Sequence, residues 1–174
     1  MKETIRYAWG TSTLGSFLVA VSERGVVALE FGSENGSLVE DLKRRFQDAD
    51  LVMDAASIAG VVVQVMDLIE APGSGTALVA DMRGSDFELR VWEALQRIPV
   101  GETTTYGALA SGLGLSGSAQ DVGAACGANT IAILVPCHRV VKKDGSVSGY
   151  RWGVPRKRAL LGREHLANFH LTKS

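Results

Sequence analysis

Residues 131–141 read IAILVPCHRVV, a run of five apolar residues followed directly by a proline, a cysteine and a histidine. The apolar run over 131–135 predicts a buried strand. Pro136 fixes its own φ, which suits a neighbouring side chain that has to be held in one place. A thiol is a good nucleophile only when it is deprotonated, and a nearby base lowers its pKa. The stretch therefore makes Cys137 a candidate nucleophile and His138 its candidate base.

Two features of these residues leave that interpretation open. Adjacent side chains of an extended segment point in opposite directions, so His138 reaches Cys137 only across a tight turn or through a bridging water. An isolated cysteine is also more often an inert core thiol than a nucleophile. The second cysteine of the chain, Cys126, either packs in the core or lines the same pocket.

The chain offers few ligands for a metal. Cys126 and Cys137 are its two cysteines, and its three histidines lie at or beyond position 138. Two thiols make a poor disulfide framework and complete a four-ligand zinc site only if histidines join them. We therefore expect no metal and no other cofactor. The apolar runs are far shorter than the ~20 residues that span a bilayer, and residues 1–20 lack a signal-peptide pattern, so we expect a cytoplasmic protein without membrane contact.

Charge is distributed unevenly along the chain, although the net charge is only −1. Residues 1–84 carry 7 Lys or Arg against 12 Asp or Glu, whereas residues 137–174 carry 9 against 2. A basic segment that begins at a Cys-His pair is a candidate surface for an anionic partner such as nucleic acid. A solvated basic terminal helix explains the same composition, and charge alone does not separate the two interpretations.

The first half of the chain predicts a small sheet with helices, from alternating apolar residues and then from helical spacing. The predicted elements are strands at 5–9, 17–21 and 26–31, helices at 38–46 and 58–69, and a strand at 76–81. Ala71–Gly75 is the clearest break, and we place a domain boundary near Gly84-Ser85.

The second half predicts mainly helices. Ser85 or Asp86 caps a helix that ends before Pro99, and two short helices follow at 106–113 and 119–127. Two short helices joined by a glycine-bearing turn form a helix-turn-helix pattern, although an ordinary helical hairpin has the same signature. The expected fold class is α/β, with a small N-terminal β-sheet plus helix domain followed by a mostly helical C-terminal domain with a helix-turn-helix.

Several separated motifs together resemble the O6-alkylguanine-DNA alkyltransferases, also called methylated-DNA–protein-cysteine methyltransferases, and most of all the C-terminal domain of the Ada type. The matching segments are Pro136–Val141 at the active-site signature, Phe87–Gly101 at the helix that opens the C-terminal domain, Tyr106 at the helix-turn-helix tyrosine, Asn129 eight residues before the cysteine, Gly149–Gly153 at the substrate loop, Glu164 at the catalytic carboxylate, and Gly15–Phe31 in the N-terminal part. The resemblance implies a ribonuclease H-like domain over 1–84 and a DNA-binding catalytic domain over 85–174.

The resemblance also implies a reaction. The protein would repair DNA by moving an alkyl group from O6-alkylguanine to Cys137, which consumes the protein, and it leaves open whether O4-alkylthymine is accepted. His138 would take the thiol proton through a water, oriented by Glu164. Asn129 would brace the turn that presents the cysteine, and Tyr106 would donate to the guanine ring as it leaves.

Substrate and DNA contacts follow from the same resemblance. The backbone carbonyls of Cys137 and Val140 would accept from the exocyclic amine, the Arg151 backbone N–H would reach O6, and Tyr150 lies in the same loop. The damaged nucleotide would have to leave the duplex, which a monomer would bind through the minor groove with little sequence preference.

The chain departs from the family at the start of the second helix of the helix-turn-helix. Many members carry an arginine there that enters the duplex, whereas this chain has Gln120-Asp121 and no Lys or Arg from 103 to 127. Gln120 still donates hydrogen bonds to the orphaned base, and we hypothesise weaker DNA affinity or base flipping. Phosphate contacts are then expected from helix N-terminal amides or from basic residues further along. The basic candidates are Arg139, Lys142, Lys143, Arg151, Arg156, Lys157 and Arg158.

Two other functions fit parts of the pattern. A non-catalytic protein that recognises alkylated DNA would bind the lesion without removing the alkyl group, but such proteins lack the nucleophilic cysteine. A cysteine hydrolase would use Cys137, His138 and Glu164 on a small substrate and need no DNA. Stoichiometry separates these functions, because a hydrolase turns over repeatedly and a transferase stops after one event.

Overall fold

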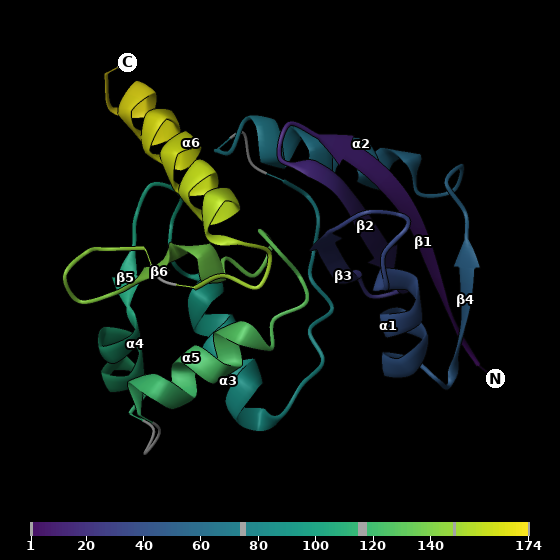
Figure 1. Ribbon diagram of the computed structural model, residues 1–174, viewed down its shortest axis with the longest axis horizontal. Coiled ribbons are helices and arrows are strands. Elements are labelled where there is room, and N and C mark those ends of the chain that lie inside the picture. The colour runs from purple at the N-terminus through teal and green to yellow at the C-terminus, as the bar shows by residue number, and fades with distance from the viewer. Residues whose placement is uncertain (1, 74–75, 115–117, 148, 174) are drawn as a thin grey trace.

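The structure is a computed structural model that describes residues 2–73, 76–114, 118–147 and 149–173. Two regions lie side by side in Figure 1: a sheet region, residues 3–70, and a helical region, residues 86–173. The α/β class and the order of the two regions agree with the sequence prediction.

The sheet region is built on four strands in the spatial order β3-β2-β1-β4. They are β1 (Glu3–Ser12), β2 (Gly15–Val21), β3 (Val26–Phe31) and β4 (Ala49–Met53). The first three form the predicted antiparallel meander, and β4 pairs in parallel with β1. The sequence analysis missed β4, because its short run ADLVM is mostly exposed and shows no buried alternation.

The two helices that the spacing predicted cover the sheet from opposite sides. Leu42 of α1 (Leu38–Arg45) is fully buried with Leu18 and Ala28 on one face. Val65 and Ile69 of α2 (Ala59–Glu70) are fully buried in the core of the other face. The alternation of side chains along β2 and β3 therefore feeds two separate cores.

Two predicted strands are wrong, for one shared reason. Residues 76–81 and 131–135 both reach the open edge of β3, but each pairs with it at a single residue, Ala80 with Val26 and Ile131 with Leu29. Because one short strand edge serves both segments, neither extends into a ladder. Residues 131–135 turn immediately after the bridge, and Ile133 adopts a φ of 71°, a left-handed conformation that is uncommon for a β-branched side chain.

The helical region carries the elements that position the site. They are α3 (Asp86–Gln96), β5 (Thr104–Thr105), α4 (Tyr106–Gly112), α5 (Ala119–Gly127), the 3₁₀ helix η1 (Cys137–Arg139), β6 (Val140–Val141) and α6 (Val154–Lys173). Ser85 and Ser118 form capping boxes at α3 and α5, and Thr105 caps α4. The two short predicted helices are confirmed as α4 and α5, which contact each other. Part of the turn between them, residues 115–117, lies outside the described residues, so the helix-turn-helix stays a prediction.

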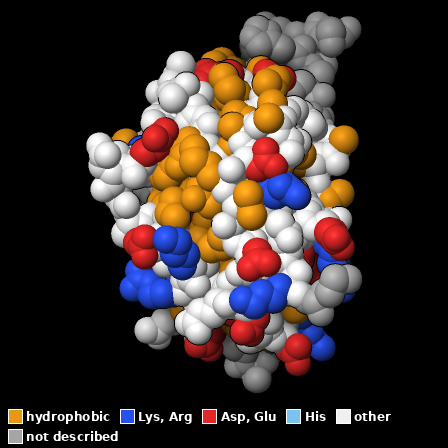
Figure 2. Space-filling model, turned by 90° about the vertical axis from the view of Figure 1, so that its right-hand side faces the viewer, with side chains coloured by type: hydrophobic (Ala, Val, Ile, Leu, Met, Phe, Trp, Pro, Cys, Tyr) orange, Lys and Arg blue, Asp and Glu red, His pale blue; other side chains and the backbone are white. Residues whose placement is uncertain are grey.

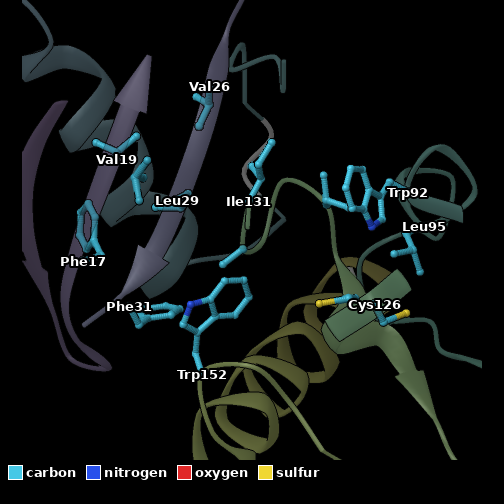
Figure 3. Close-up of a cluster of buried hydrophobic side chains, with 14 of the residues drawn as sticks. Phe17, Val19, Val26, Leu29, Phe31, Trp92, Leu95, Cys126, Ile131 and Trp152 are labelled. Carbon is cyan, nitrogen blue, oxygen red and sulfur yellow. The ribbon is translucent and has the colours of Figure 1, made fainter. Parts of the chain in front are cut away.

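One hydrophobic core runs through both regions (Figure 3). Phe17 and Leu29 from the sheet pack in the same cluster as Trp92, Ile131 and Trp152 from the helical region. The segments on either side of the predicted boundary therefore share their buried surface.

Figure 2 shows the face of the sheet region that is turned away from the helical region. Hydrophobic side chains gather on this face beside Lys, Arg, Asp and Glu side chains. Among exposed apolar residues of this region, Met53 and Val63 are 61% and 54% exposed. No helix within the described part of the chain is long and apolar enough to cross a bilayer.

Candidate active site

Cys137 opens the 3₁₀ helix η1, directly after Pro136. The 3₁₀ helix is a tight turn, one of the two expected ways to link Cys137 and His138: the Arg139 N–H donates to the Pro136 carbonyl, and the Val140 N–H donates to the Cys137 carbonyl. The turn buries the adjacent side chains of Cys137 and His138 together, with 5% and 0% exposed.

Asn129 braces the loop that leads to Cys137. Its Nδ2 donates to the Val135 carbonyl at 2.9 Å and lies 3.3 Å from Cys137 Sγ. Its Oδ1 accepts from the Ile131 N–H at 2.9 Å. One buried amide thus ties both ends of the 131–135 turn and touches the thiol, which matches the bracing geometry expected of Asn129.

His138 belongs to a closed polar cluster. Its Nε2 lies 2.8 Å from Glu164 Oε2, and Arg139 donates to the same carboxylate through Nε at 2.8 Å and Nη2 at 2.9 Å. Burial opposes ionisation of Glu164, but hydrogen bonds from His138 and Arg139 outweigh it and lower the Glu164 pKa below its usual value. The carboxylate is therefore an anion that fixes both neighbours.

The same cluster sets the protonation of His138. Burial lowers the pKa of His138 below 6.5, and the Glu164 charge only partly opposes this. The ring is then neutral at neutral pH, and its Nε2 proton is donated to the carboxylate, which leaves Nδ1 as an acceptor. Nδ1 is buried and has no hydrogen-bond partner among the described residues. A histidine in this state is ready to accept a proton.

A cavity of about 430 Å³ lies against the thiol. It is lined by Tyr106, Gly123, Cys126, Gly127, Cys137, Gly149, Tyr150 and Arg151. Three of the predicted site residues besides the cysteine therefore meet at one cavity. Both alternatives expected for Cys126 occur, because it packs in the core and also lines this pocket.

Tyr150 forms part of the cavity wall. Its ring packs edge-on against Trp152 with the centroids 5.1 Å apart. Its hydroxyl is buried without a hydrogen-bond partner among the described residues. Burial raises the pKa of Tyr150 well above its usual value, so the hydroxyl stays protonated and can donate to a ligand.

The resting thiol is protonated. Burial raises the pKa of Cys137, and the Asn129 hydrogen bond and the positive charges of Lys157 and Arg151 oppose that rise without cancelling it. A base is therefore needed before the sulfur can act as a nucleophile. Burial likewise raises the pKa of Cys126, to about 12, so this second thiol is less acidic than an exposed cysteine.

Lys157 is a site residue whose place the sequence analysis missed. It was a phosphate candidate, but it is 1% exposed, with Nζ 3.4 Å from the Gly149 carbonyl and 5.9 Å from the centre of the Tyr106 ring. The helical spacing of Lys157, Leu160 and Glu164 was the available signal, because positions i, i+3 and i+7 share one helix face. All three are buried.

Other phosphate candidates are also corrected. Arg139 is 8% exposed and donates to Glu164 and to the Ile98 carbonyl, so its guanidinium is not available to DNA. Arg156 donates to the carbonyls of Leu14 and Trp152, which fixes α6 against the sheet region. Lys142, Lys143 and Arg158 are exposed and stay candidates.

Two predicted substrate contacts lie outside the cavity wall. Val140 is fully buried in β6, where it pairs with Thr104 of β5. Gln120 is exposed near the start of α5. Neither is among the described residues that line the cavity. No group of three or more Cys, His, Asp or Glu side chains that could hold a metal occurs in the described ranges.

Comparison with known proteins decides the family. Residues 86–166 match the family model described as "6-O-methylguanine DNA methyltransferase, DNA binding domain". The chain is 35% identical over 156 residues to the inducible methylated-DNA–protein-cysteine methyltransferase of Bacillus subtilis, a match that covers 88% of this chain and 86% of that protein. This chain belongs to the methylated-DNA–protein-cysteine methyltransferase family.

Other members of the methyltransferase family agree with this assignment. The bifunctional transcriptional activator/DNA repair enzyme Ada of Escherichia coli is 42% identical over 160 residues, which are 92% of this chain and 45% of that protein. The chain thus spans about half the length of this relative and of the regulatory protein ada of Salmonella typhimurium, of which it covers 46%. The crystal structure of Mycobacterium tuberculosis OGT in complex with DNA superposes with a TM-score of 0.78 at 34% identity, covering 93% of this chain and 94% of that chain.

Proposed function

We propose that this chain repairs DNA directly, by transferring an alkyl group, above all methyl, from O6 of guanine to Sγ of Cys137. One observation carries the proposal: a buried thiol faces a cavity and is followed by a neutral histidine whose Nδ1 has no partner in the described residues. Membership of the methyltransferase family supports the same reaction.

The proposed step is an in-line displacement. The Cys137 thiol gives its proton to Nδ1 of His138 through a water, and the sulfur lone pair forms a bond to the alkyl carbon while the bond from that carbon to O6 breaks. The imidazolium that forms is stabilised by the Glu164 anion, which Arg139 holds in place. Guanine leaves as a neutral base because Tyr106, at the cavity wall, donates its hydroxyl proton to the ring, and the tyrosinate regains a proton from the His138 imidazolium through water.

The product explains why the protein is consumed. The sulfur ends as a thioether, which water does not hydrolyse, so each molecule accepts one alkyl group. A cysteine hydrolase would instead release its acyl group and react again. The position of the cavity, between α5 and the 149–151 loop, suits a base that has been turned out of a duplex.

The proposed partner is duplex DNA that contains O6-alkylguanine, bound by a monomer through the minor groove. The match of residues 86–166 to a DNA-binding family model and the likeness to a relative solved with DNA support DNA as the partner. In this proposal Gln120 donates hydrogen bonds to the orphaned base, and exposed Lys142, Lys143 and Arg158 contact phosphates.

Mass spectrometry tests the function. Wild-type protein mixed with a duplex that contains O6-methylguanine should gain one methyl group on the peptide holding Cys137 and restore guanine in the DNA. The Cys137→Ser variant should gain none, and the matched variant Cys126→Ser, which changes the other cavity thiol, should still gain one. An unmodified wild-type protein that binds the damaged duplex would instead indicate a recognition protein.

A further inference from the structure

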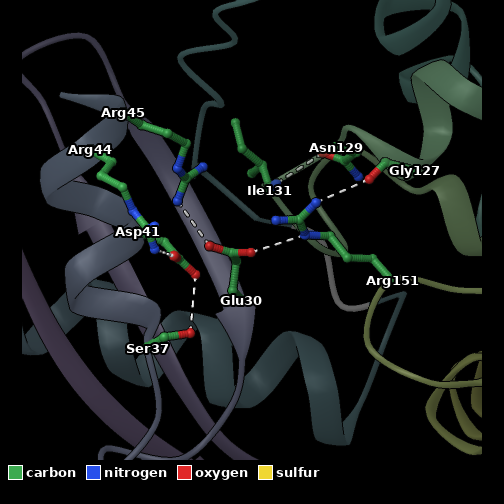
Figure 4. A network of polar contacts seen from close by, with 9 residues as sticks. All are labelled: Glu30, Ser37, Asp41, Arg44, Arg45, Gly127, Asn129, Ile131 and Arg151. Atoms are coloured by element: carbon green, nitrogen blue, oxygen red, sulfur yellow. Dashed lines mark hydrogen bonds and ion pairs between the residues drawn. The ribbon is translucent and has the colours of Figure 1, made fainter.

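Glu30 is a buried carboxylate to which the reaction assigns no role. It stands in β3 of the sheet region and is 2% exposed. Its Oε2 accepts from Nη2 of Arg45 at 2.9 Å, and its Oε1 accepts from Nε of Arg151 at 3.2 Å (Figure 4). A carboxylate so little exposed is stable as an anion only where cations or donors pair with it, so both arginines matter to it.

Arg151 connects this carboxylate to the cavity. It lies in the loop over 149–151 that forms one wall, and its guanidinium Nη1 also donates to the Gly127 carbonyl at 3.1 Å. Gly127 is the last residue of α5 and lines the cavity as well. Arg151 therefore joins three elements: the substrate loop, the end of α5 and, through Glu30, the sheet.

The residue next to Glu30 holds the segment that leads to Cys137. The Leu29 N–H donates to the Thr130 carbonyl at 2.9 Å, and the Ala132 N–H donates to the Leu29 carbonyl at 2.8 Å. This pairing anchors the segment that turns into Cys137. Two consecutive residues of β3 thus hold the segments that lead to Cys137 and carry Arg151, one through its backbone and the other through its carboxylate.

We propose that Glu30 is a positioning residue for alkyl transfer, which through Arg151 holds the substrate loop at the spacing from Cys137 that a flipped O6-alkylguanine requires. The inference rests on the proposed function. It assigns to the sheet region a part in the chemistry, although none of its residues lines the described cavity. Freed from Glu30, the loop samples wider positions and the base is held less often in line with the sulfur.

The structure supplies a matched control. Arg45 pairs with the same carboxylate but stands on α1 and does not touch the substrate loop. Arg45→Gln removes one partner of Glu30 and keeps the other, whereas Glu30→Gln and Arg151→Gln both break the tie to the loop. A purely stabilising ion pair predicts the same kinetics for all three variants once the folded fraction is equal.

Single-turnover transfer from an O6-methylguanine duplex, with protein in excess, tests the proposal. We expect Glu30→Gln and Arg151→Gln to slow transfer about tenfold each, the double variant to be no slower than either, and Arg45→Gln to stay within about twofold of wild type, as coupled residues require. Affinity of Glu30→Gln for the undamaged duplex should be unchanged, since Glu30 does not touch DNA. Thermal unfolding establishes the folded fraction of each variant.

The outcomes are distinct. Wild-type rates for both Glu30→Gln and Arg151→Gln, equal slowing by Arg45→Gln, or additive losses in the double variant would each overturn the proposal. If Glu30→Gln does not fold, Arg151→Gln decides alone, because the Arg151 side chain is 37% exposed and its loss leaves a smaller defect. Absence of methyl transfer by the wild-type protein would remove the proposed function, and this inference with it.

Discussion

Two buried carboxylates organise this molecule, Glu164 in the helical region and Glu30 in the sheet region, and they differ in what they hold. Each is about 2% exposed and each pairs with two side chains. The partners of Glu164 are adjacent in sequence and buried, and one of them is the histidine next to the nucleophile. The partners of Glu30 come from distant segments, and their side chains are 28% and 37% exposed.

In the proposed mechanism Glu164 controls a proton, whereas the role proposed for Glu30 is to control a distance. The side chains of the Glu164 cluster are at most 9% exposed, so the charge of the carboxylate is little screened at His138. The Glu30 cluster is reached by solvent at both arginines, so it acts as a tie between segments. The following experiments test this division of roles.

Replacing Glu164 should have the largest effect. Glu164→Gln removes the anion that stabilises the His138 imidazolium and leaves Arg139 buried without a counter-charge. We expect alkyl transfer to slow by about 100-fold, the size usual for a general-base contribution, and the free energy of unfolding to fall by about 3 kcal/mol. Single-turnover rates and urea unfolding measure the two effects. His165→Gln, at an exposed neighbour on α6, is the matched control and should change neither.

Acid should slow transfer through His138. Burial lowers the pKa of this histidine below 6.5, and only the neutral ring accepts the thiol proton. The rate should therefore hold constant as the pH falls to 6.5 and drop about tenfold per pH unit below the lowered pKa. Folding has the same sign, since the unfolded histidine binds its proton at higher pH than the folded one, so stability falls on acidification below 6.5.

The Glu30 cluster, as far as the structure describes it, contains no histidine, so the pH–rate profile distinguishes the roles of the two carboxylates. Glu30→Gln should lower the plateau of the pH–rate profile without moving its acid limb. A shifted acid limb in Glu30→Gln would mean that this carboxylate also acts on the proton, and the division drawn above would be wrong.

Gln120 lies apart from both carboxylates, so a variant at this position tests DNA affinity alone. Gln120→Arg should tighten binding to duplex DNA severalfold and steepen the dependence of log affinity on log salt by about one unit. Titration of a fluorescent duplex at several salt concentrations gives both values. Unchanged affinity together with an unchanged repair rate would show that glutamine at position 120 does not weaken DNA binding or base flipping.

Salt should change the stability of variants of the two clusters differently, and this is the smallest effect that we expect. Arg151→Gln should lower the free energy of unfolding by about 1 kcal/mol or less at low salt, and this difference should shrink in 1 M NaCl because the pair is partly exposed. The deficit of Glu164→Gln should persist in the same salt, because its cluster is buried. Chemical unfolding at two salt concentrations compares them, and equal salt sensitivity would argue against the division.

Much of the fold was predictable where local chemistry decides it. Short stretches of sequence specify the meander of β1 to β3 and the helix caps, and the structure has both at these positions. The capping residues are Ser85, Thr105 and Ser118. The predicted strands at 76–81 and 131–135 failed because their only pairing partner, the edge of β3, is divided between them. Sharing of a strand edge between distant segments leaves no local pattern.

The predictions about the site also depended on whether adjacent or distant residues decide a feature. Side-chain direction called for a tight turn or a bridging water between Cys137 and His138, and η1 is a tight turn at this place. Arg139 and Lys157 were assigned to phosphate because a charge count does not show which cations are buried. Glu30 left one signal that the sequence analysis did not use, a single acid in the otherwise apolar strand VVALEF.

The core shared by the two regions has a consequence for how the chain melts. Phe17 and Leu29 belong to the same buried cluster as Trp92 and Trp152, so neither region can unfold without exposing apolar surface of the other. Heating should therefore give a single calorimetric transition whose van't Hoff and calorimetric enthalpies agree. Residues 86–166, although they match a family model by themselves, should not form a cooperative unit when expressed without the sheet.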